Sequence, residues 1–209
     1  MFTPLAGRPV LEHSVAAFEA APGVDEIVLV AAPSLASRAG ELLAGGGYRK
    51  LTRVISDGET GARASRAAIG ALGTADRRLV VHDAARPLVS AQVIEDCVAS
   101  LATCPAVCAV VPAADTMVAV EDGVITQRPH RDGLRRRQTP QGFRLPVLRR
   151  AHELALADPA FQPLDDCGVV LRYLPEVPVR LIPGSERNIA ITSPESLAAA
   201  EALLGNPVP

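Results

Sequence analysis

Short apolar runs alternate with segments of helical pattern along this chain, and the alternation constrains its fold more than any other feature. The runs Ile27–Ala31 (IVLVA) and Val107–Val111 (VCAVV) are apolar throughout. Continuous apolar runs of this length are typical of strands buried on both faces of a parallel sheet. Strands of this kind that alternate with helices predict an α/β fold with a doubly wound, mostly parallel sheet, whose ligands bind at the carboxyl ends of the strands.

The same patterns give residue ranges for the individual elements. Strands are predicted at Ile27–Ala31, Leu51–Ile55, Leu79–His82, Val107–Val111 and Val179–Ile182. Helices are predicted at Ser34–Ala44, Ala62–Leu72, Ala91–Ala102, Leu145–Ala157, Asp166–Tyr173 and Pro194–Leu204. Ser34 and Ser193 are the expected caps of the first and last of these helices, because a serine hydroxyl can accept a hydrogen bond from the exposed backbone N–H groups of a first turn.

One segment departs from the α/β pattern. Met117–Val120 and Val124–Gln127 are short β-type runs on either side of Asp122-Gly123, a pair that is typical of tight hairpin turns. We therefore predict one domain over residues 1–209, with a β-arm at about 116–135. A two-stranded hairpin is marginal in water by itself, so we expect the arm to dock on a second copy and form a homodimer.

Composition excludes several classes of partner. Hydrophobic residues make up 48% of the chain and charged residues 21%, a balance that favours a globular protein over a disordered one. The net charge of −2 gives no basic field for nucleic acid, so the run Arg135–Arg137 is interpreted as a solvated face or an anion contact. No signal sequence or membrane-length apolar run is present, and the prediction is a cytoplasmic protein with no membrane partner.

The four cysteines, Cys97, Cys104, Cys108 and Cys167, form no CxxC pair that would indicate a metal site. We expect buried free thiols in a reducing compartment.

The segment His82–Pro87 (HDAARP) directly follows a predicted strand. A carboxylate at the carboxyl end of a strand faces the ligand crevice, where Asp83 could hold a divalent cation on phosphate groups. Arg86, three residues on, could contact another phosphate oxygen. Spacing alone leaves a second interpretation open, in which Asp83 caps the loop and Arg86 is solvated.

Three further polar segments allow both a ligand and a structural interpretation. Gln138–Phe143 (QTPQGF) offers a hydroxyl and two amides beside a proline, which suit either a polar ligand or a capped loop. The backbone of Asp57–Gly61 could receive an anion, although an ordinary strand-to-helix turn is the favoured interpretation. Asp165-Asp166 could be a pair of metal ligands, but acidic residues at a helix N-terminus are the simpler explanation.

Together these segments resemble 2-C-methyl-D-erythritol 4-phosphate cytidylyltransferases. The matching segments, in the family's order and spacing, are Phe2–His13, His82–Pro87, Asp115-Thr116, Gln138–Phe143, Asp165-Asp166, Asn188-Ile189 and Ile191–Glu195. The resemblance extends from residue 2 to about residue 204, and HDAARP together with QTPQGF at this separation is its most specific part.

The resemblance implies a reaction of CTP with methylerythritol phosphate that releases diphosphate, in which the protein positions the reactants and neutralises charge. It implies that Asp83 holds Mg²⁺ on the triphosphate and that Gly58 lets the backbone approach the nucleotide. The substrate side would be bound by Arg86, Thr116, Arg131 and Thr139. Arg131 would act from the arm, in the active site of the partner of a homodimer.

The chain also departs from the family pattern. In the family, an apolar strand and a glycine-rich loop ending in Pro-Lys come just before the segment that matches Phe2, so we expect this first strand and loop to be missing. No catalytic residue is therefore carried over. Arg187 stands where the family has a metal-binding aspartate, and we expect it to weaken Mg²⁺ binding.

Other departures replace polar family residues with apolar ones. Val118 and Ala190 stand at two lysine positions, and Leu164 stands at a threonine position. Three functions thus stay open: a methylerythritol phosphate cytidylyltransferase, a cytidylyltransferase for another polyol phosphate such as ribitol phosphate, and a catalytically impaired paralogue that acts as a binding or regulatory partner.

Overall fold

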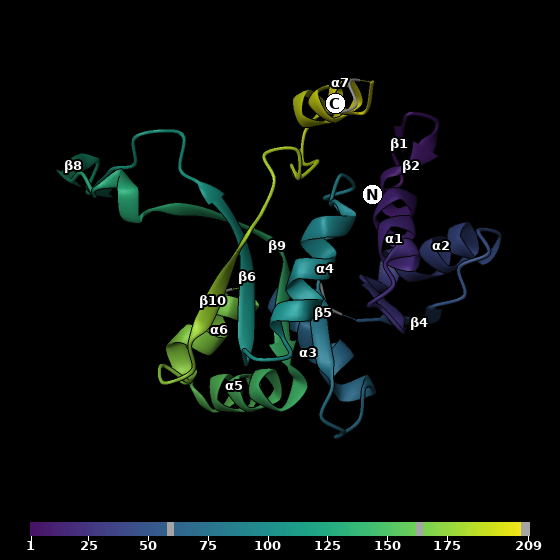
Figure 1. Cartoon of the computed structure of the whole chain (residues 1–209), viewed down its shortest axis with the longest axis horizontal. Coiled ribbons are helices and arrows are strands. Elements are labelled where there is room, and N and C mark those ends of the chain that lie inside the picture. The colour runs from purple at the N-terminus through teal and green to yellow at the C-terminus, as the bar shows by residue number, and fades with distance from the viewer. Residues whose placement is uncertain (58–60, 162–164, 206–209) are drawn as a thin grey trace.

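The computed structural model describes residues 1–57, 61–161 and 165–205 of the chain (Figure 1). Gly58, predicted to bind the nucleotide, and Leu164 lie outside the described residues. The fold places helices around a central sheet, from which an arm extends on one side (Figure 1).

The central sheet has four strands in the order β10-β6-β9-β5. β10 (Val179–Pro183) is parallel to β6 (Ala106–Pro112), whereas β9 (Arg135–Arg144) is antiparallel to both of its neighbours, β6 and β5 (Arg78–Val81). Three of the four strands therefore share one direction, which confirms the predicted α/β fold with a mostly parallel sheet. Their carboxyl ends lie at the same edge.

β9 corrects one of the two interpretations of QTPQGF, the capped loop, because these residues form part of a strand. Cys108 of β6 pairs with Gln141 and Val110 pairs with Arg137, so the stretch 138–140 of β9 bulges opposite one β6 residue. Pro140, which follows a cis peptide bond, lies in this bulge, where no ladder hydrogen bond is required of it. Proline usually ends a strand because it has no N–H group to donate to the ladder. Its position in the bulge explains why β9 continues past it.

Side chains of β6 alternate between two hydrophobic clusters, as expected for a strand buried on both faces. Ala106 and Cys108 belong to one cluster, together with buried residues of α5 and α6. Val107 and Ala109 belong to the other, together with residues of α4. The helices concerned are α4 (Ala91–Ser100), α5 (Leu145–Ala157) and α6 (Asp166–Tyr173).

A second, two-stranded sheet pairs β3 (Ile27–Ala31) in parallel with β4 (Leu51–Ser56). Within the described ranges, no ladder hydrogen bonds join it to the central sheet. A cavity of about 1270 Å³ lies between the two sheets and is lined by β3 and β5. The strand and glycine-rich loop that we expect to be missing were inferred by comparison with the family pattern, and their absence stays a prediction.

The remaining elements lie outside these two sheets, and the first two of them pair with each other in a short antiparallel ladder. They are β1 (Pro4–Leu5), β2 (Arg8–Pro9), α1 (Val10–Ala20), α2 (Pro33–Ala44), α3 (Gly61–Ala71), the 3-10 turn η1 (Arg131–Gly133) and α7 (Pro194–Gly205). α2 begins at Pro33 with Ala32 as its N-cap, so the predicted cap at Ser34 is wrong; proline suits the first helical position and starts the helix one residue earlier. The Ser193 hydroxyl accepts from the Ser196 N–H at 3.3 Å, which confirms that cap.

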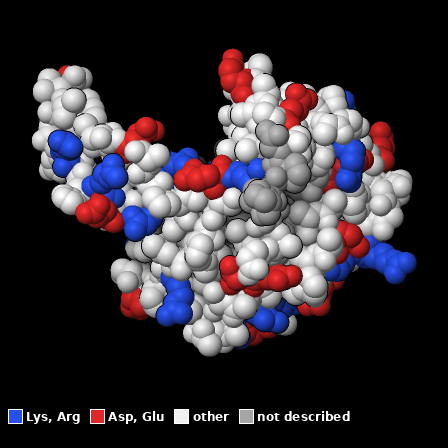
Figure 2. Space-filling model, turned by 45° about the horizontal axis from the view of Figure 1, so that its top comes forward, with Lys and Arg blue, Asp and Glu red and all other residues white. Residues whose placement is uncertain are grey.

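The predicted hairpin is present in the arm. β7 (Ala119–Glu121) pairs antiparallel with β8 (Val124–Gln127), and the turn residues Asp122 and Gly123 have φ angles of 48° and 78°. Two consecutive positive φ angles are typical of a tight hairpin turn of the primed type. Figure 2 shows the arm projecting from the body of the molecule, with basic side chains along it.

All four cysteines are free, and three of them, Cys97, Cys108 and Cys167, are buried. Burial raises the pKa of the Cys97 thiol to about 12, so it stays protonated. Cys104 is half-buried. Across the described residues, the helices are all too short or too polar to span a bilayer.

Candidate active site

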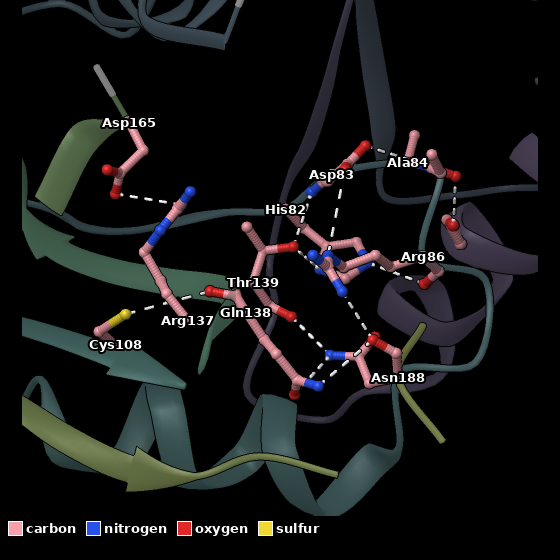
Figure 3. Close-up of polar contacts among 12 residues, drawn as sticks. His82, Asp83, Ala84, Arg86, Cys108, Arg137, Gln138, Thr139, Asp165 and Asn188 are labelled. Carbon is pink, nitrogen blue, oxygen red and sulfur yellow. Dashed lines mark hydrogen bonds and ion pairs between the residues drawn. The ribbon is translucent and has the colours of Figure 1, made fainter. Parts of the chain in front are cut away.

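Three segments meet at the edge where β5 and β10 end (Figure 3). They are the loop after β5, which carries Asp83 and Arg86, the bulge of β9, which carries Thr139, and the loop after β10, which carries Asn188. This edge is the crevice expected to bind ligands in an α/β sheet. The structure thus brings together three of the predicted site residues: Asp83, Arg86 and Thr139.

Thr139 joins the HDAARP loop to β9. Its hydroxyl oxygen accepts the backbone N–H of Asp83 at 3.0 Å and lies 3.1 Å from Nδ1 of His82. His82 Nε2 donates to the carbonyl of Arg86 at 3.1 Å, and burial lowers the pKa of His82 to about 4, so at neutral pH Nδ1 carries no proton and accepts from Thr139. The Thr139 proton is therefore directed at His82.

Asp83 caps its loop, one of the two interpretations that the sequence left open, and its role as a cation ligand stays a prediction. Its Oδ1 accepts the N–H of Ala85 at 3.0 Å, which caps the loop, and Oδ2 lies 4.0 Å from Nε of Arg86. The side chain is still 47% exposed. A single half-exposed carboxylate suits Mg²⁺, which is commonly held by one or two carboxylates together with substrate phosphates.

Arg86 is anchored rather than solvated, which corrects one of its two interpretations. Nη1 donates to the carbonyl of Asn188 at 2.7 Å, and the side chain is only 20% exposed. Burial lowers the pKa of Arg86, and the positive charges of Arg137 and Arg136 lower it further. Nε of Arg86 and Oδ1 of Asn188 are buried without a hydrogen-bond partner among the described residues, so the site keeps unused donor and acceptor capacity.

The two amides of QTPQGF are structural. Gln138 donates from Nε2 to the carbonyl of Ser185 at 2.8 Å and accepts the Ser185 N–H at 3.2 Å. Gln141 donates to Asp165 at 2.9 Å and accepts the Cys167 N–H at 3.0 Å. These buried amides attach the loops that follow β10 and precede α6, which is why β9 organises the edge of the sheet.

The carboxylates of Asp165 and Asp166 have partners within the protein. Asp165 is the N-cap of α6 and accepts the N–H of Cys167, whereas Asp166 is buried and accepts from Ser65 at 2.6 Å and from His152 at 2.8 Å. Within the described ranges, no three His, Cys, Asp or Glu residues cluster as metal ligands. Acidity at the helix N-terminus, the simpler explanation, is therefore confirmed.

The remaining predicted residues lie elsewhere. Thr116 and Arg131 are exposed and belong to the arm, which Figure 1 shows extending away from the sheet edge. Arg187 donates from its guanidinium to the carbonyl of Leu203 in the last turn of α7, so this side chain interacts with a helix C-terminus.

The arginine run divides between two acidic partners. Arg137 Nη1 lies 3.1 Å from Oδ2 of Asp165 (Figure 3), and Arg136 pairs with Glu186. Sequence analysis missed these ion pairs, and it also missed Asn188 as an anchor for Arg86. The available signal for Asn188 was its place in a segment that matches the family pattern, Asn188-Ile189.

The family model for 2-C-methyl-D-erythritol 4-phosphate cytidylyltransferase matches residues 1–206. The cytidylyltransferase of this name from Thermobifida fusca is 50% identical over 207 residues, with 96% of this chain and 83% of the relative covered. A bifunctional ribulose 5-phosphate reductase/CDP-ribitol pyrophosphorylase of Haemophilus influenzae is 34% identical, with 97% of this chain and 43% of that protein covered.

Solved structures agree with the sequence comparison. The 4-diphosphocytidyl-2C-methyl-D-erythritol synthase of Anaerococcus prevotii has a TM-score of 0.88 at 25% identity, covering 97% of this chain and 88% of that one. The 2-C-methyl-D-erythritol 4-phosphate cytidylyltransferase of Thermus thermophilus has a TM-score of 0.78 at 28% identity, covering 98% and 93%. With its sheet edge, its HDAARP and QTPQGF motifs and these matches, the chain belongs to the 2-C-methyl-D-erythritol 4-phosphate cytidylyltransferase family.

Proposed function

We propose that this chain transfers the cytidylyl group of CTP to methylerythritol phosphate in the cytoplasm. An oxygen of the acceptor phosphate attacks the α-phosphorus of CTP, and the bond from that phosphorus to the diphosphate breaks. The observation that supports this proposal is the set of contacts that holds Asp83, Arg86 and Thr139 together at the sheet edge, in a chain of this family. Transfer of a phosphoryl-type group requires that the reactants are positioned and that their negative charge is neutralised, and this arrangement of residues can supply both.

Each residue has a distinct part in this proposal. Asp83 would hold Mg²⁺, which supplies neutralisation of the triphosphate charge when it is bound. Arg86, oriented by the Asn188 carbonyl, faces the acceptor side. Thr139 acts first as a positioning residue, because it orients Asp83 and His82. Gly58, on the nucleotide side, keeps its predicted role.

Thr116 and Arg131 would complete the site from the arm of a second copy. The arm exposes apolar side chains in unusual number: Met117 (49%), Val118 (42%), Val120 (55%), Val124 (64%) and Ile125 (64%). Covering them by a second copy removes this apolar surface from water and brings each Arg131 toward the partner. We therefore propose a homodimer of single domains, residues 1–209, that exchange arms.

Ribitol phosphate is the second candidate acceptor. The Haemophilus relative, named for CDP-ribitol formation, matches 97% of this chain. Val118 and Ala190, which replace two lysines of the family pattern, alter the charge available to an acceptor. A catalytically impaired partner protein is the third candidate, and it would keep the arm and lose turnover.

The test is release of diphosphate from CTP and Mg²⁺ with each acceptor in turn. We expect turnover with methylerythritol phosphate, and Asp83→Asn should lower kcat/KM by about 10²–10³-fold, as for loss of one preorganised electrostatic group. Asp76→Asn is the matched control, because Asp76 lies before β5, is similarly exposed at 52% and pairs only with Arg144 among the described contacts. Turnover confined to ribitol phosphate would favour the second candidate, and none with either acceptor would favour the third.

A further inference from the structure

The arginine run at the start of β9 contains one side chain whose position differs from that of its neighbour. Arg137 lines the large cavity together with Thr139, Gln141 and Asp83, and it points toward Asp165 (Figure 3). Arg136 instead pairs with Glu186 outside that lining. The two arginines are equally exposed, at 49% and 50%, so they differ in place and not in accessibility.

The partner of Arg137 does not depend on it. A single oxygen of Asp165, Oδ2, accepts from Gln141 Nε2 at 2.9 Å, from the Cys167 N–H at 3.1 Å and from Arg137 Nη1 at 3.1 Å. If Arg137 leaves, the other two donors still satisfy this oxygen. Half-exposed ion pairs contribute little to stability, so the guanidinium can exchange Asp165 for a stronger anion at small cost.

This exchange would add a third positive charge to those that Arg86 and Arg131 are proposed to bring to the acceptor. In the proposed reaction two polyanions must meet at this edge, and a cation held by Asp83 would neutralise charge on the triphosphate. The acceptor phosphate needs its own positive charge, and the guanidinium fork is well suited to bind phosphate through two oxygens. Arg137 lines the same cavity as Asp83 and Thr139, and its positive charge lowers the pKa of Arg86.

We propose that Arg137 is a substrate-binding and specificity-determining residue, which exchanges Asp165 for the phosphate group of the polyol phosphate acceptor. This inference rests on the proposed function and adds to it a residue that none of the matched family motifs contains. It predicts that Arg137, in addition to Arg86 and Arg131, helps the site to distinguish an acceptor phosphate from an uncharged polyol. Asp165 serves as the holding position for the guanidinium when no acceptor is bound.

The test compares Arg137→Gln with Arg136→Gln, the adjacent arginine of equal exposure. We expect Arg137→Gln to raise the KM for methylerythritol phosphate by about 10- to 100-fold, as for loss of a charge-assisted bidentate pair, while the KM for CTP stays within about 2-fold. Arg136→Gln should change neither constant by more than about 2-fold. Arg137→Lys should fall between wild type and Arg137→Gln, because lysine restores the charge without the fork.

Two results would overturn the inference. One is an unchanged acceptor KM in Arg137→Gln, and the other is an equal rise in both arginine variants, which would indicate a general effect of surface charge. If wild-type protein turns over neither acceptor, the proposed function fails by itself. Calorimetric titration with methylerythritol phosphate, and with methylerythritol as the uncharged control, then decides: equal affinity of wild type and Arg137→Gln for the phosphate ester would refute the role of Arg137.

Discussion

Thr139 and His82 lie 57 positions apart in the chain, yet one hydrogen bond between them sets the geometry of the site. The buried imidazole is neutral and directs the threonine proton, and the threonine oxygen in turn holds the backbone of Asp83. The family resemblance pointed to Asp83, Arg86 and Thr139, and the structure brings the three together, while their roles stay predictions. The resemblance could not show that Gln138 and Gln141 are structural, because their partners lie 24 to 50 residues away and only the folded chain brings them into contact.

Glu26 is the residue at which a change of pH should act on stability. Hydrogen bonds from Thr52 and Arg53 lower the pKa of Glu26, and the charges of Arg53 and Arg77 add to this effect. A carboxylate whose pKa is lower in the folded state stabilises the fold above its unfolded value near 4.5, and this contribution is lost as the pH falls through the folded pKa. Glu26 bridges β4 and the residue before β5, so its charge links the two sheets.

We therefore expect Glu26→Gln to lower the free energy of unfolding at pH 7 by about 1 kcal/mol or less, the range of exposed ion pairs. The difference from wild type should shrink below pH 4. Urea unfolding of both proteins between pH 7 and pH 3 measures it. Glu41→Gln, on the exposed side of α2, is the control, and a Glu26→Gln deficit that persists unchanged at pH 3 would contradict the role of the charge.

At the scale of elements, β9 is a strand of the central sheet that sequence patterns did not find. Buried strands such as β6 were predicted because their side chains are apolar on both faces. β9 begins with three exposed arginines and contains Pro140. Its buried part includes Gln138 and Gln141, which are polar and are therefore not expected to be buried from the sequence alone. Its place in the sheet depends on hydrogen bonds made by those amides, a property that hydrophobic periodicity does not record.

A substitution at Gly142 probes how closely β9 packs against its neighbours. A Cβ atom at this position would lie 2.7 Å from Val107, 2.8 Å from Cys97 and 2.9 Å from Leu101. Gly142→Ala should therefore destabilise the protein by about 1–3 kcal/mol through overpacking. In Gly40→Ala, the control on α2, the new Cβ meets no atom within 4 Å, and the change should stabilise the helix by about 0.5–1 kcal/mol. Thermal or urea unfolding measures both, and equal shifts of the same sign would refute the packing argument.

At the scale of the whole molecule, the arm is the least covered part. The Asp-Gly pair predicted its turn, because few other pairs tolerate two positive φ angles. Sequence patterns could not show how exposed its apolar side chains would be. Val120, Val124 and Ile125 are each more than half exposed. These side chains are therefore the surface at which the proposed dimer contact can be tested by substitution.

The double variant Val120→Glu/Ile125→Glu should convert the proposed dimer to a monomer, because like charges would replace the apolar contact. Light scattering at micromolar concentration measures the mass. Leu171→Glu is the matched control, since Leu171 is 56% exposed on α6, outside the arm. A wild-type monomer, or a double variant that remains dimeric, would contradict arm exchange.

The cavity between β3 and β5 also has a consequence for how the molecule fluctuates. The β3–β4 sheet has its own hydrophobic cluster, built on Leu11, Val15, Ala39 and Leu43, and it shares no ladder with the central sheet in the described chain. Regions joined by few hydrogen bonds open at free energies below that of global unfolding. We therefore expect the part around β3 and β4 to open more readily than the central sheet, so that amides of β3 exchange with solvent deuterium faster than those of β6.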